Sequence, residues 1–315
     1  MEFINILIAT ITAAVLLSLA VSFICFLKVF YSPKRKNLDS EVIDIPDGEI
    51  YEEYRKEMTD WVISTRAMDS KEYKIKSIDG LDLYARYYEY QKGAPIEILF
   101  HGYKGNAERD LSGGVERCFS LGRNALIVDQ RAHGKSDGSV ISFGVKERFD
   151  CLEWTKFAVK EFGEDSTIIL TGISMGGATV MMASDLDLPK NVVCILSDCG
   201  YSSPSKIIEK VVRDLRLPAP LLMPFVKLGA KIFGRFDLDE SSALQSVKKT
   251  SIPIIFIHGD TDDFVPYEMS AECYYACAST KSLVKVAGAG HGLAYPKDKQ
   301  LYLTSLSDFQ KRCGF

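Results

Sequence analysis

The stretch Gly172-Ile173-Ser174-Met175-Gly176 decides the fold of this chain, because of the segments on either side of it. Residues 166–171 before it are β-branched and apolar, which predicts a buried strand, and residues 177–183 after it are small and apolar at helical spacing. A serine placed between a strand and a helix in a G-x-S-x-G pattern is typical of a nucleophile elbow. We therefore predict that Ser174 is a nucleophile on a sharp turn, whose flanking glycines let the strand and the helix approach each other.

A serine hydroxyl needs a base to act as a nucleophile, and the base needs a carboxylate to orient it. Where the nucleophile lies on such an elbow, the chain order is Ser, then Asp or Glu, then His. The chain has four histidines, and of these only His258 and His291 follow Ser174. His258 ends the apolar segment 252–257 and is interpreted as a strand-end residue. His291 lies in the glycine loop 287–292, where packing gives no reason for a histidine, so we predict that it is the general base.

The acid is expected in the loop that follows His258, and three aspartates lie there: Asp260, Asp262 and Asp263. Aspartates in such clusters are commonly turn residues or helix caps. Spacing alone does not choose among the three.

Several motifs accompany the elbow in a fixed order. They are Leu99-Phe100-His101-Gly102-Tyr103, Asp129-Gln130-Arg131-Ala132-His133-Gly134-Lys135-Ser136, and His258-Gly259-x-x-Asp262-x-x-Val265-Pro266. With the elbow, these motifs resemble the α/β-hydrolase superfamily, and more narrowly its bacterial, membrane-anchored serine hydrolases of the esterase and peptidase-like branch. The resemblance implies an α/β fold with a mostly parallel sheet flanked by helices. It also implies that Asp262 is the acid and that Asp260 and Asp263 are turn residues. Asp198, which follows another strand, is an alternative acid because some family members place theirs there.

The same resemblance implies an oxyanion hole, which needs hydrogen-bond donors aimed at the charge that develops in the transition state. Its donors would be the backbone N–H groups of Met175 and Tyr103. His101 and His133 then brace loops. No metal or organic cofactor is implied.

Residues 3–27 contain no charged side chain and are long enough to span a bilayer as a helix. A secretory signal peptide is the competing interpretation, but it would have a basic N-terminus, a shorter apolar core and a small-residue cleavage site. The sequence has none of these features, so residues 1–30 are predicted to be a retained transmembrane anchor.

Charge and cysteine usage indicate where the rest of the chain lies. Four basic residues follow the anchor, against one acidic residue, Glu2, before it: Lys28, Lys34, Arg35 and Lys36. The positive-inside rule then places the catalytic domain in the cytoplasm. Eight cysteines without a framework spacing fit a reducing compartment. A net charge of −4 without a basic domain argues against nucleic acid as a partner.

Residues 31–70 are predicted to be a linker followed by an amphipathic docking helix over 49–66, and residues 71–315 a single hydrolase domain. Asp79-Gly80 predicts a β-hairpin, and the alternation of strands and helices after it predicts a parallel sheet. An insertion at about 203–250, rich in proline and apolar residues, is interpreted as a cap over the nucleophile. The alternative is an enlarged surface helix pair.

Together these features predict a membrane-anchored serine hydrolase that cleaves carboxylic esters of a small-molecule or lipid-derived acyl group. Thioester and peptide bonds stay open as substrates. An acyltransferase with the same triad, or a non-catalytic binding protein with this fold, are the alternatives.

Overall fold

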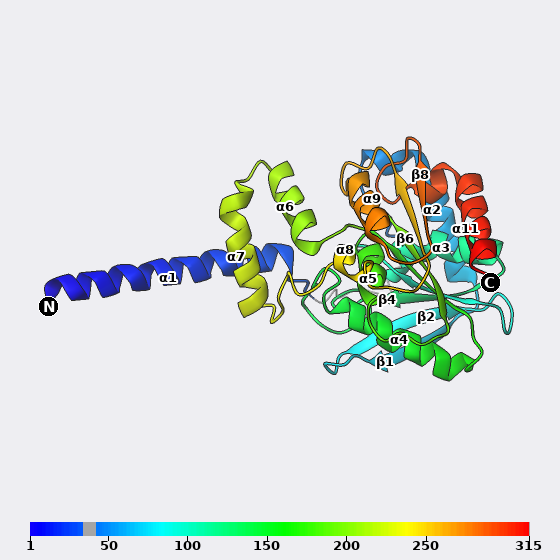
Figure 1. Ribbon diagram of the computed structural model, residues 1–315, viewed down its shortest axis with the longest axis horizontal. Helices are drawn as coiled ribbons and strands as arrows, with labels where there is room; N and C mark the ends of the chain where they lie inside the picture. The colour runs from blue at the N-terminus through cyan, green and yellow to red at the C-terminus, as the bar shows by residue number, and fades with distance from the viewer. Residues whose placement is uncertain (34–41, 315) are drawn as a thin grey trace.

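The computed structural model describes residues 1–33 and 42–314, so residues 34–41 of the predicted linker lie outside the described residues. Within these ranges the strands form one eight-stranded sheet in the order β1-β2-β4-β3-β5-β6-β7-β8 (Figure 1). The strands are β1 (Lys71–Lys76), β2 (Asp82–Tyr88), β3 (Ile96–Phe100), β4 (Asn124–Asp129), β5 (Ile168–Ile173), β6 (Val192–Asp198), β7 (Ile254–Gly259) and β8 (Lys281–Val286). β2 is antiparallel to β1 and to β4, and the remaining pairs are parallel. The predicted mostly parallel sheet and the hairpin at Asp79-Gly80 are confirmed.

Helices cover both faces of the sheet, which is why β3, β4 and β7 are buried along their whole length. Successive strand residues point to opposite faces, so Phe100 packs in one core cluster and Leu99 in another. One face carries α4 (Glu147–Phe162), α5 (Met175–Ala183) and α9 (Tyr267–Ala276), and the other carries α3 (Ala107–Ser120) and α11 (Lys299–Cys313). Two single-turn helices, α8 (Ala243–Ser246) and α10 (Ala294–Lys297), complete the domain.

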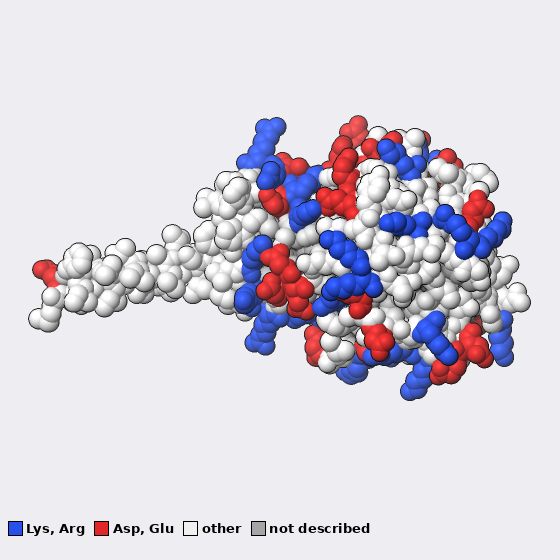
Figure 2. Space-filling model, in the orientation of Figure 1, with Lys and Arg blue, Asp and Glu red and all other residues white. Residues whose placement is uncertain are grey.

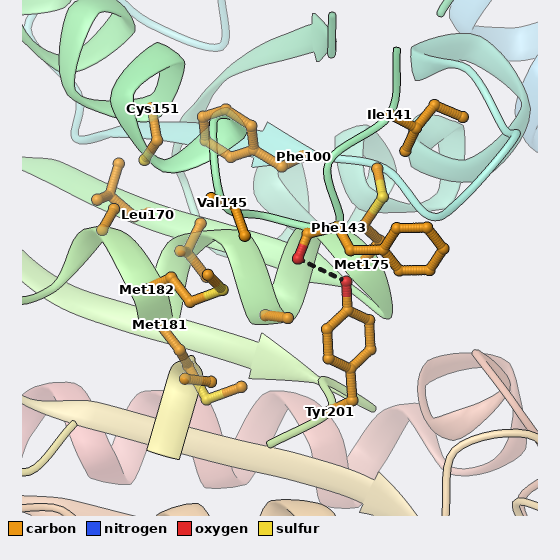
Figure 3. Packing of buried hydrophobic residues seen from close by; sticks show 14 of the residues in the cluster. Phe100, Ile141, Phe143, Val145, Cys151, Leu170, Met175, Met181, Met182 and Tyr201 are labelled. Carbon is orange, nitrogen blue, oxygen red and sulfur yellow. Dashed lines mark hydrogen bonds between the residues drawn. The ribbon is translucent and has the colours of Figure 1, made fainter. Parts of the chain in front are cut away.

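The core around α5 holds the start of this helix in place. Met175, Met181 and Met182 are fully buried on α5 and pack with residues of β3, β5 and the 141–145 loop (Figure 3). The Tyr201 hydroxyl donates a hydrogen bond of 3.0 Å to the Phe143 carbonyl across this cluster (Figure 3). The first residue of α5 is therefore set in a close-packed interior that resists displacement.

The docking segment, which we define as residues 46–67, begins with a 3-10 helix, η1 (Glu49–Tyr54), and continues as α2 (Arg55–Ala67). A helix over 49–66 is the predicted element, and its first turns take the tighter 3-10 form. Val62 is 1% exposed, and the Trp61 ring stacks on Tyr295 with a centroid separation of 5.9 Å. The apolar side of this segment therefore packs on the domain.

Helix α1 (Glu2–Val29) projects from the body at its N-terminal end and enters the body at its C-terminal end (Figure 1). It is the one described helix that is long and apolar enough to cross a membrane. Phe30, directly after it, is fully buried and makes edge contacts with Phe143 and Phe236 at 5.8 and 5.3 Å. The C-terminal end of α1 is thus part of the hydrophobic core of the domain.

The insertion after β6 forms two helices, α6 (Pro204–Asp214) and α7 (Ala219–Ile232), which lie beside α1 (Figure 1). The proline-rich stretch predicted here is helical, with Pro220 in the first turn of α7, where its missing N–H costs no hydrogen bond. After α7, the Phe233 ring contacts Phe23 and Phe26 of α1 at centroid separations of 5.0 and 5.9 Å. The apolar surface of the insertion is therefore buried in part against α1.

Candidate active site

Ser174 lies on the turn between β5 and α5, with φ 55° and ψ −114°. A side chain at this φ is strained by about 1–3 kcal/mol, so the surroundings must impose the conformation. A Cβ added to Gly172 would lie 2.0 Å from the carbonyl carbon of Gly176, and a Cβ added to Gly176 would lie 2.0 Å from the Phe100 carbonyl oxygen. The two glycines are required because strand and helix approach too closely for any side chain.

Three side chains meet at this turn in one hydrogen-bond chain. His291 Nε2 lies 3.0 Å from Ser174 Oγ, and His291 Nδ1 lies 2.7 Å from Asp262 Oδ2. Asp262 comes from the loop after β7 and His291 from the loop after β8. The Ser174 residue is 6% exposed and the His291 side chain 14% exposed, so the chain of bonds is shielded yet reachable. The imidazole can accept the serine proton while the carboxylate holds the ring.

The three aspartates of the loop after β7 take different positions. Asp262 Oδ1 accepts backbone hydrogen bonds from Phe264 and Val265 at 2.9 and 2.8 Å, which fixes the carboxylate. Asp260 instead accepts from the Gly288 N–H at 2.7 Å and so ties the two loops together. The carbonyl of Asp263 accepts a hydrogen bond from a lysine of α6, Lys210. Only the Asp262 carboxylate of the three bonds to His291 in the described structure.

The alternative acid, Asp198, is buried at the end of β6 and accepts a hydrogen bond of 2.8 Å from the Tyr302 hydroxyl. Burial raises the pKa of its carboxyl group above the ordinary value. Its backbone carbonyl accepts the Ser174 N–H at 2.8 Å. Asp198 therefore supports the turn through its main chain, and it makes no side-chain hydrogen bond to a histidine among the described residues.

His258 contacts the same carboxylate, which the interpretation as a strand-end residue did not anticipate. Its Nε2 lies 3.2 Å from Asp262 Oδ2 and 2.8 Å from the Val265 carbonyl, and its Nδ1 lies 2.7 Å from Ser270 Oγ. The sequence signal for this contact is the four-residue spacing from His258 to Asp262. Burial opposes ionisation of Asp262, but the hydrogen bonds from His258 and His291 outweigh it and hold the pKa of Asp262 well below its usual range.

The two backbone N–H groups predicted as an oxyanion hole belong to Met175, the residue after Ser174, and to Tyr103, whose neighbour Gly102 packs against Ser174. Neither the Tyr103 N–H nor the Met175 N–H donates a hydrogen bond to another described residue. Met175 is the first residue of α5, where an N–H has no partner inside the helix and the helix dipole favours negative charge. Both N–H groups are therefore without an acceptor among the described residues, as the predicted role as oxyanion donors requires.

His101 and His133 brace the loop that carries Tyr103. His101 Nε2 accepts from the Gln130 N–H at 3.0 Å, and His133 Nε2 accepts from the Lys104 N–H at 3.0 Å. Burial, with the neighbouring His133, lowers the pKa of His101 to about 3, so this ring stays neutral.

A cavity of about 400 Å³ opens at Ser174, within the range of small-molecule sites. Its lining includes residues of the docking segment: Pro46, Asp47, Tyr51, Met58 and Trp61. Helices α6 and α7, both fully described, contribute none of its lining residues. The expectation that the 203–250 insertion covers Ser174 therefore differs from the structure, because α1 takes up the apolar surface of this insertion. The docking segment lines the cavity in its place.

One group of candidate metal ligands occurs among the described residues, and it coincides with this site: Cys199, Asp262 and His291, with ligand atoms within 4.8 Å of one another. Asp262 and His291 are already hydrogen-bonded to each other. Burial raises the pKa of the Cys199 thiol well above its ordinary value, which opposes the thiolate that a metal needs. The donor set favours the hydrogen-bonded arrangement over a metal centre.

Comparisons with known proteins bear on this arrangement. No protein-family model matches the chain. The solved structure of the Pyrococcus furiosus esterase Pf2001 aligns with 87% of this chain and 99% of its own, at a TM-score of 0.63 and 22% identity. The α/β hydrolase GrgF from Penicillium sp. sh18 aligns with 78% of this chain and 99% of its own, at a TM-score of 0.61 and 18% identity.

The chain has the α/β-hydrolase fold. The candidate site residues lie in loops beyond the carboxyl ends of parallel strands, where open α/β sheets in general bind their ligands. Tyr103 follows β3, Ser174 follows β5, Asp262 follows β7 and His291 follows β8.

Two curated relatives are similar to this chain in sequence. The protein YqkD of Bacillus subtilis is 24% identical over 78% of this chain and 81% of its own length. The lysophosphatidylserine lipase ABHD12 of Danio rerio is 26% identical over 63% of this chain, but the match spans only 52% of its length. These relatives and structural neighbours support a hydrolase in general.

Proposed function

We propose that this protein is a membrane-anchored serine hydrolase that cleaves carboxylic ester bonds. The single observation that carries the proposal is the hydrogen-bond chain from Ser174 Oγ through His291 to Asp262, with distances of 3.0 and 2.7 Å. These distances lie within the reach that a nucleophile, its base and the orienting acid need.

In the proposed reaction, Ser174 Oγ attacks the ester carbonyl carbon while its proton passes to His291 Nε2. The imidazolium that forms is stabilised by the Asp262 carboxylate, which stays ionised. His291 then gives the proton to the leaving alcohol, and an acyl-enzyme remains on Ser174. Water, deprotonated by His291, attacks the acyl-enzyme, releases the carboxylic acid and restores the serine.

The negative oxygen of each tetrahedral intermediate would bind the backbone N–H groups of Tyr103 and Met175. Both donors are free of protein acceptors in the described structure. Their positions are set before the substrate binds, by the braced loop after β3 and the packed start of α5, so no reorganisation is needed during the reaction.

The lining of the cavity favours an apolar acyl group. Ring and aliphatic side chains from four segments of the chain line it: Met58, Trp61, Leu111, Phe264 and Tyr295. A volume of about 400 Å³ suits one extended chain or a small ring. ABHD12 is named a lysophosphatidylserine lipase, that is, a lipase for a lipid with a single acyl chain, and this agrees with an apolar acyl group. We therefore propose an ester of a lipid-derived acyl chain as the substrate class.

Helix α1 supplies the membrane anchor in this proposal. Its N-terminal turns expose a continuous apolar surface, which is unfavourable in water and favourable in the hydrocarbon of a bilayer. The positive-inside rule, applied to the basic residues at and after its C-terminal end, supports a cytoplasmic hydrolase domain. All eight cysteines are free thiols, as a reducing compartment would keep them.

The test is covalent labelling of the full chain in detergent with a fluorophosphonate, which reacts with a base-activated serine. We expect labelling at Ser174, identified by peptide mass mapping, and its loss in Ser174→Ala and His291→Ala. Ser251→Ala, an exposed serine outside the cavity, is the control and should label like the wild type. Absence of labelling in folded protein would overturn the hydrolase proposal and favour a binding protein with this fold.

A further inference from the structure

The hairpin formed by α6, α7 and their connection carries an exposed apolar surface that the active site does not use. At its tip Leu215, Leu217 and Leu221 are 64%, 47% and 63% exposed. Pro218 and Pro220, between them, are exposed as well. Clustered large apolar side chains at a helical turn mark an interaction surface, because a soluble face would not keep them together.

The hairpin is fixed against α1 by close packing. Gly229 of α7 faces the Ser22 carbonyl so closely that an added Cβ would lie 2.5 Å from its oxygen. The Phe233 ring lies 5.0 Å from Phe23. Ser22 is fully buried and Phe26 nearly so, whereas residues 1–17 of α1 are exposed. The contact with α7 therefore marks the point where α1 leaves the body of the protein.

Figure 1 shows α7 crossing α1 instead of running alongside it, with the free part of α1 extending beyond the crossing. The 20 residues from Phe3 to Ser22 run from the free end of α1 to its contact with Gly229. At about 1.5 Å per residue they span about 30 Å, which equals the hydrocarbon thickness of a bilayer. If α1 spans a membrane, α7 must cross it at the boundary between hydrocarbon and headgroups.

The charge distribution around the hairpin agrees with a position at the boundary between hydrocarbon and headgroups. Figure 2 shows an uncharged surface that runs from α1 onto the hairpin, with both basic and acidic side chains beside it. Arg216, Lys231 and Arg235 are exposed at the ends of the hairpin helices, and none forms an ion pair within residues 1–33 and 42–314. Cationic side chains next to exposed leucines suit the phosphates of a lipid surface, since their stems lie in the apolar layer and their charges reach the headgroups.

We propose that the α6–α7 hairpin lies in the interface of the bilayer that α1 spans, with Leu215, Leu217 and Leu221 among the acyl chains and Arg216 and Lys231 at the phosphates. This inference rests on the membrane anchor of the proposed function. The hairpin gives the domain a second contact with the lipid, so that its height and tilt above the membrane are set by two elements, where a tether alone would leave them free.

The experiment places single tryptophans in the full chain, reconstituted in bilayers of phosphatidylcholine and phosphatidylglycerol with or without bromine on the acyl chains. Leu221→Trp reports on the hairpin, Leu16→Trp on the exposed part of α1, and Tyr275→Trp, on an exposed residue of α9, is the matched control. The wild-type protein gives the emission of Trp61 and Trp154, which is subtracted from the emission of each variant.

We expect brominated lipid to quench most of the added emission in Leu221→Trp and Leu16→Trp, and to leave Tyr275→Trp unchanged. Quenching of Leu16→Trp with none of Leu221→Trp would overturn the hairpin proposal while the anchor stands. Absence of quenching in Leu16→Trp would overturn the anchor itself. A blue-shifted but unquenched Leu221→Trp would assign the surface to a second copy of the chain and also overturn the proposal.

Discussion

The hydroxyl group of Tyr103 donates a hydrogen bond of 2.7 Å to the backbone carbonyl of Val29. Val29 is the last residue of α1, and the backbone of Tyr103 carries one of the two proposed oxyanion donors. The end of the proposed anchor is therefore bonded directly to the loop that completes the active site. A displacement of α1 would therefore act directly on the loop that carries the Tyr103 N–H.

Tyr103→Phe tests this link, since it removes the hydroxyl and keeps the backbone N–H. We expect a loss of about 1 kcal/mol in the free energy of unfolding, because the half-buried Val29 carbonyl loses its donor. The turnover number should fall only a few-fold. Thermal unfolding in detergent and ester hydrolysis measure the two effects, and an unchanged unfolding midpoint would contradict the link.

The choice of acid is tested by three isosteric variants. Asp262→Asn should reduce turnover by about 10⁴-fold, because an amide holds the imidazole in the wrong tautomer. Asp260→Asn and Asp263→Asn should stay within a few-fold of the wild type, since neither carboxylate reaches His291. If Asp260→Asn lost its turnover and Asp262→Asn kept it, Asp260 would be the acid instead.

The hydrogen bond between His258 and the Asp262 carboxylate leads to a prediction for His258→Gln. A hydrogen bond to a charged group contributes about 1.5–3 kcal/mol, so its loss should lower turnover by roughly 10- to 100-fold with little change in KM. With one donor fewer, the Asp262 carboxylate directs more of its charge at His291 and stabilises the imidazolium, so the acid limb of the pH–rate profile should move to higher pH. A purely structural role would lower stability and leave the position of the acid limb unchanged.

The pH dependence of stability should carry a contribution from His101. The unfolded chain protonates this residue below about pH 6.5, whereas the folded chain keeps it neutral down to about pH 3. The unfolded state thus binds more protons in this window, and stability falls by up to about 1.4 kcal/mol per pH unit as the pH drops through it. Above pH 6.5 the contribution is constant.

His101→Asn should therefore be less stable at pH 7 but show a flatter decline between pH 6.5 and pH 5. Unfolding midpoints of the wild type and the variant, measured across this range, provide the comparison. Equal slopes would show that His101 does not contribute to acid sensitivity.

The docking segment leads to a prediction for Trp61→Ala. Removal of the ring opens the wall of the cavity and loses its stacking on Tyr295, so we expect kcat/KM for long-chain esters to fall by about 10-fold, with acetate esters nearly unaffected. A series of p-nitrophenyl esters of increasing chain length measures this. Leu217→Ala on the hairpin is the control, because that side chain lies outside the cavity lining.

Local sequence determined the elements and the candidate residues. The β-branched run before Ser174 and the paired glycines around it specify a strand, a turn and a helix through backbone sterics alone. The Asp79-Gly80 hairpin and the apolar run of α1 follow from neighbouring residues in the same way. The glycine loop around His291 makes it the predicted base from sequence alone.

Only the tertiary structure decided which surfaces meet. The proline-rich insertion is equally apolar as a cap or as a partner of α1, and its packing on Phe23 and Phe26 depends on residues about 200 positions away in the chain. The same holds for the docking segment that lines the cavity. Periodicity encodes which side of an element is apolar, but the partner of that side is set by the close packing of the whole chain.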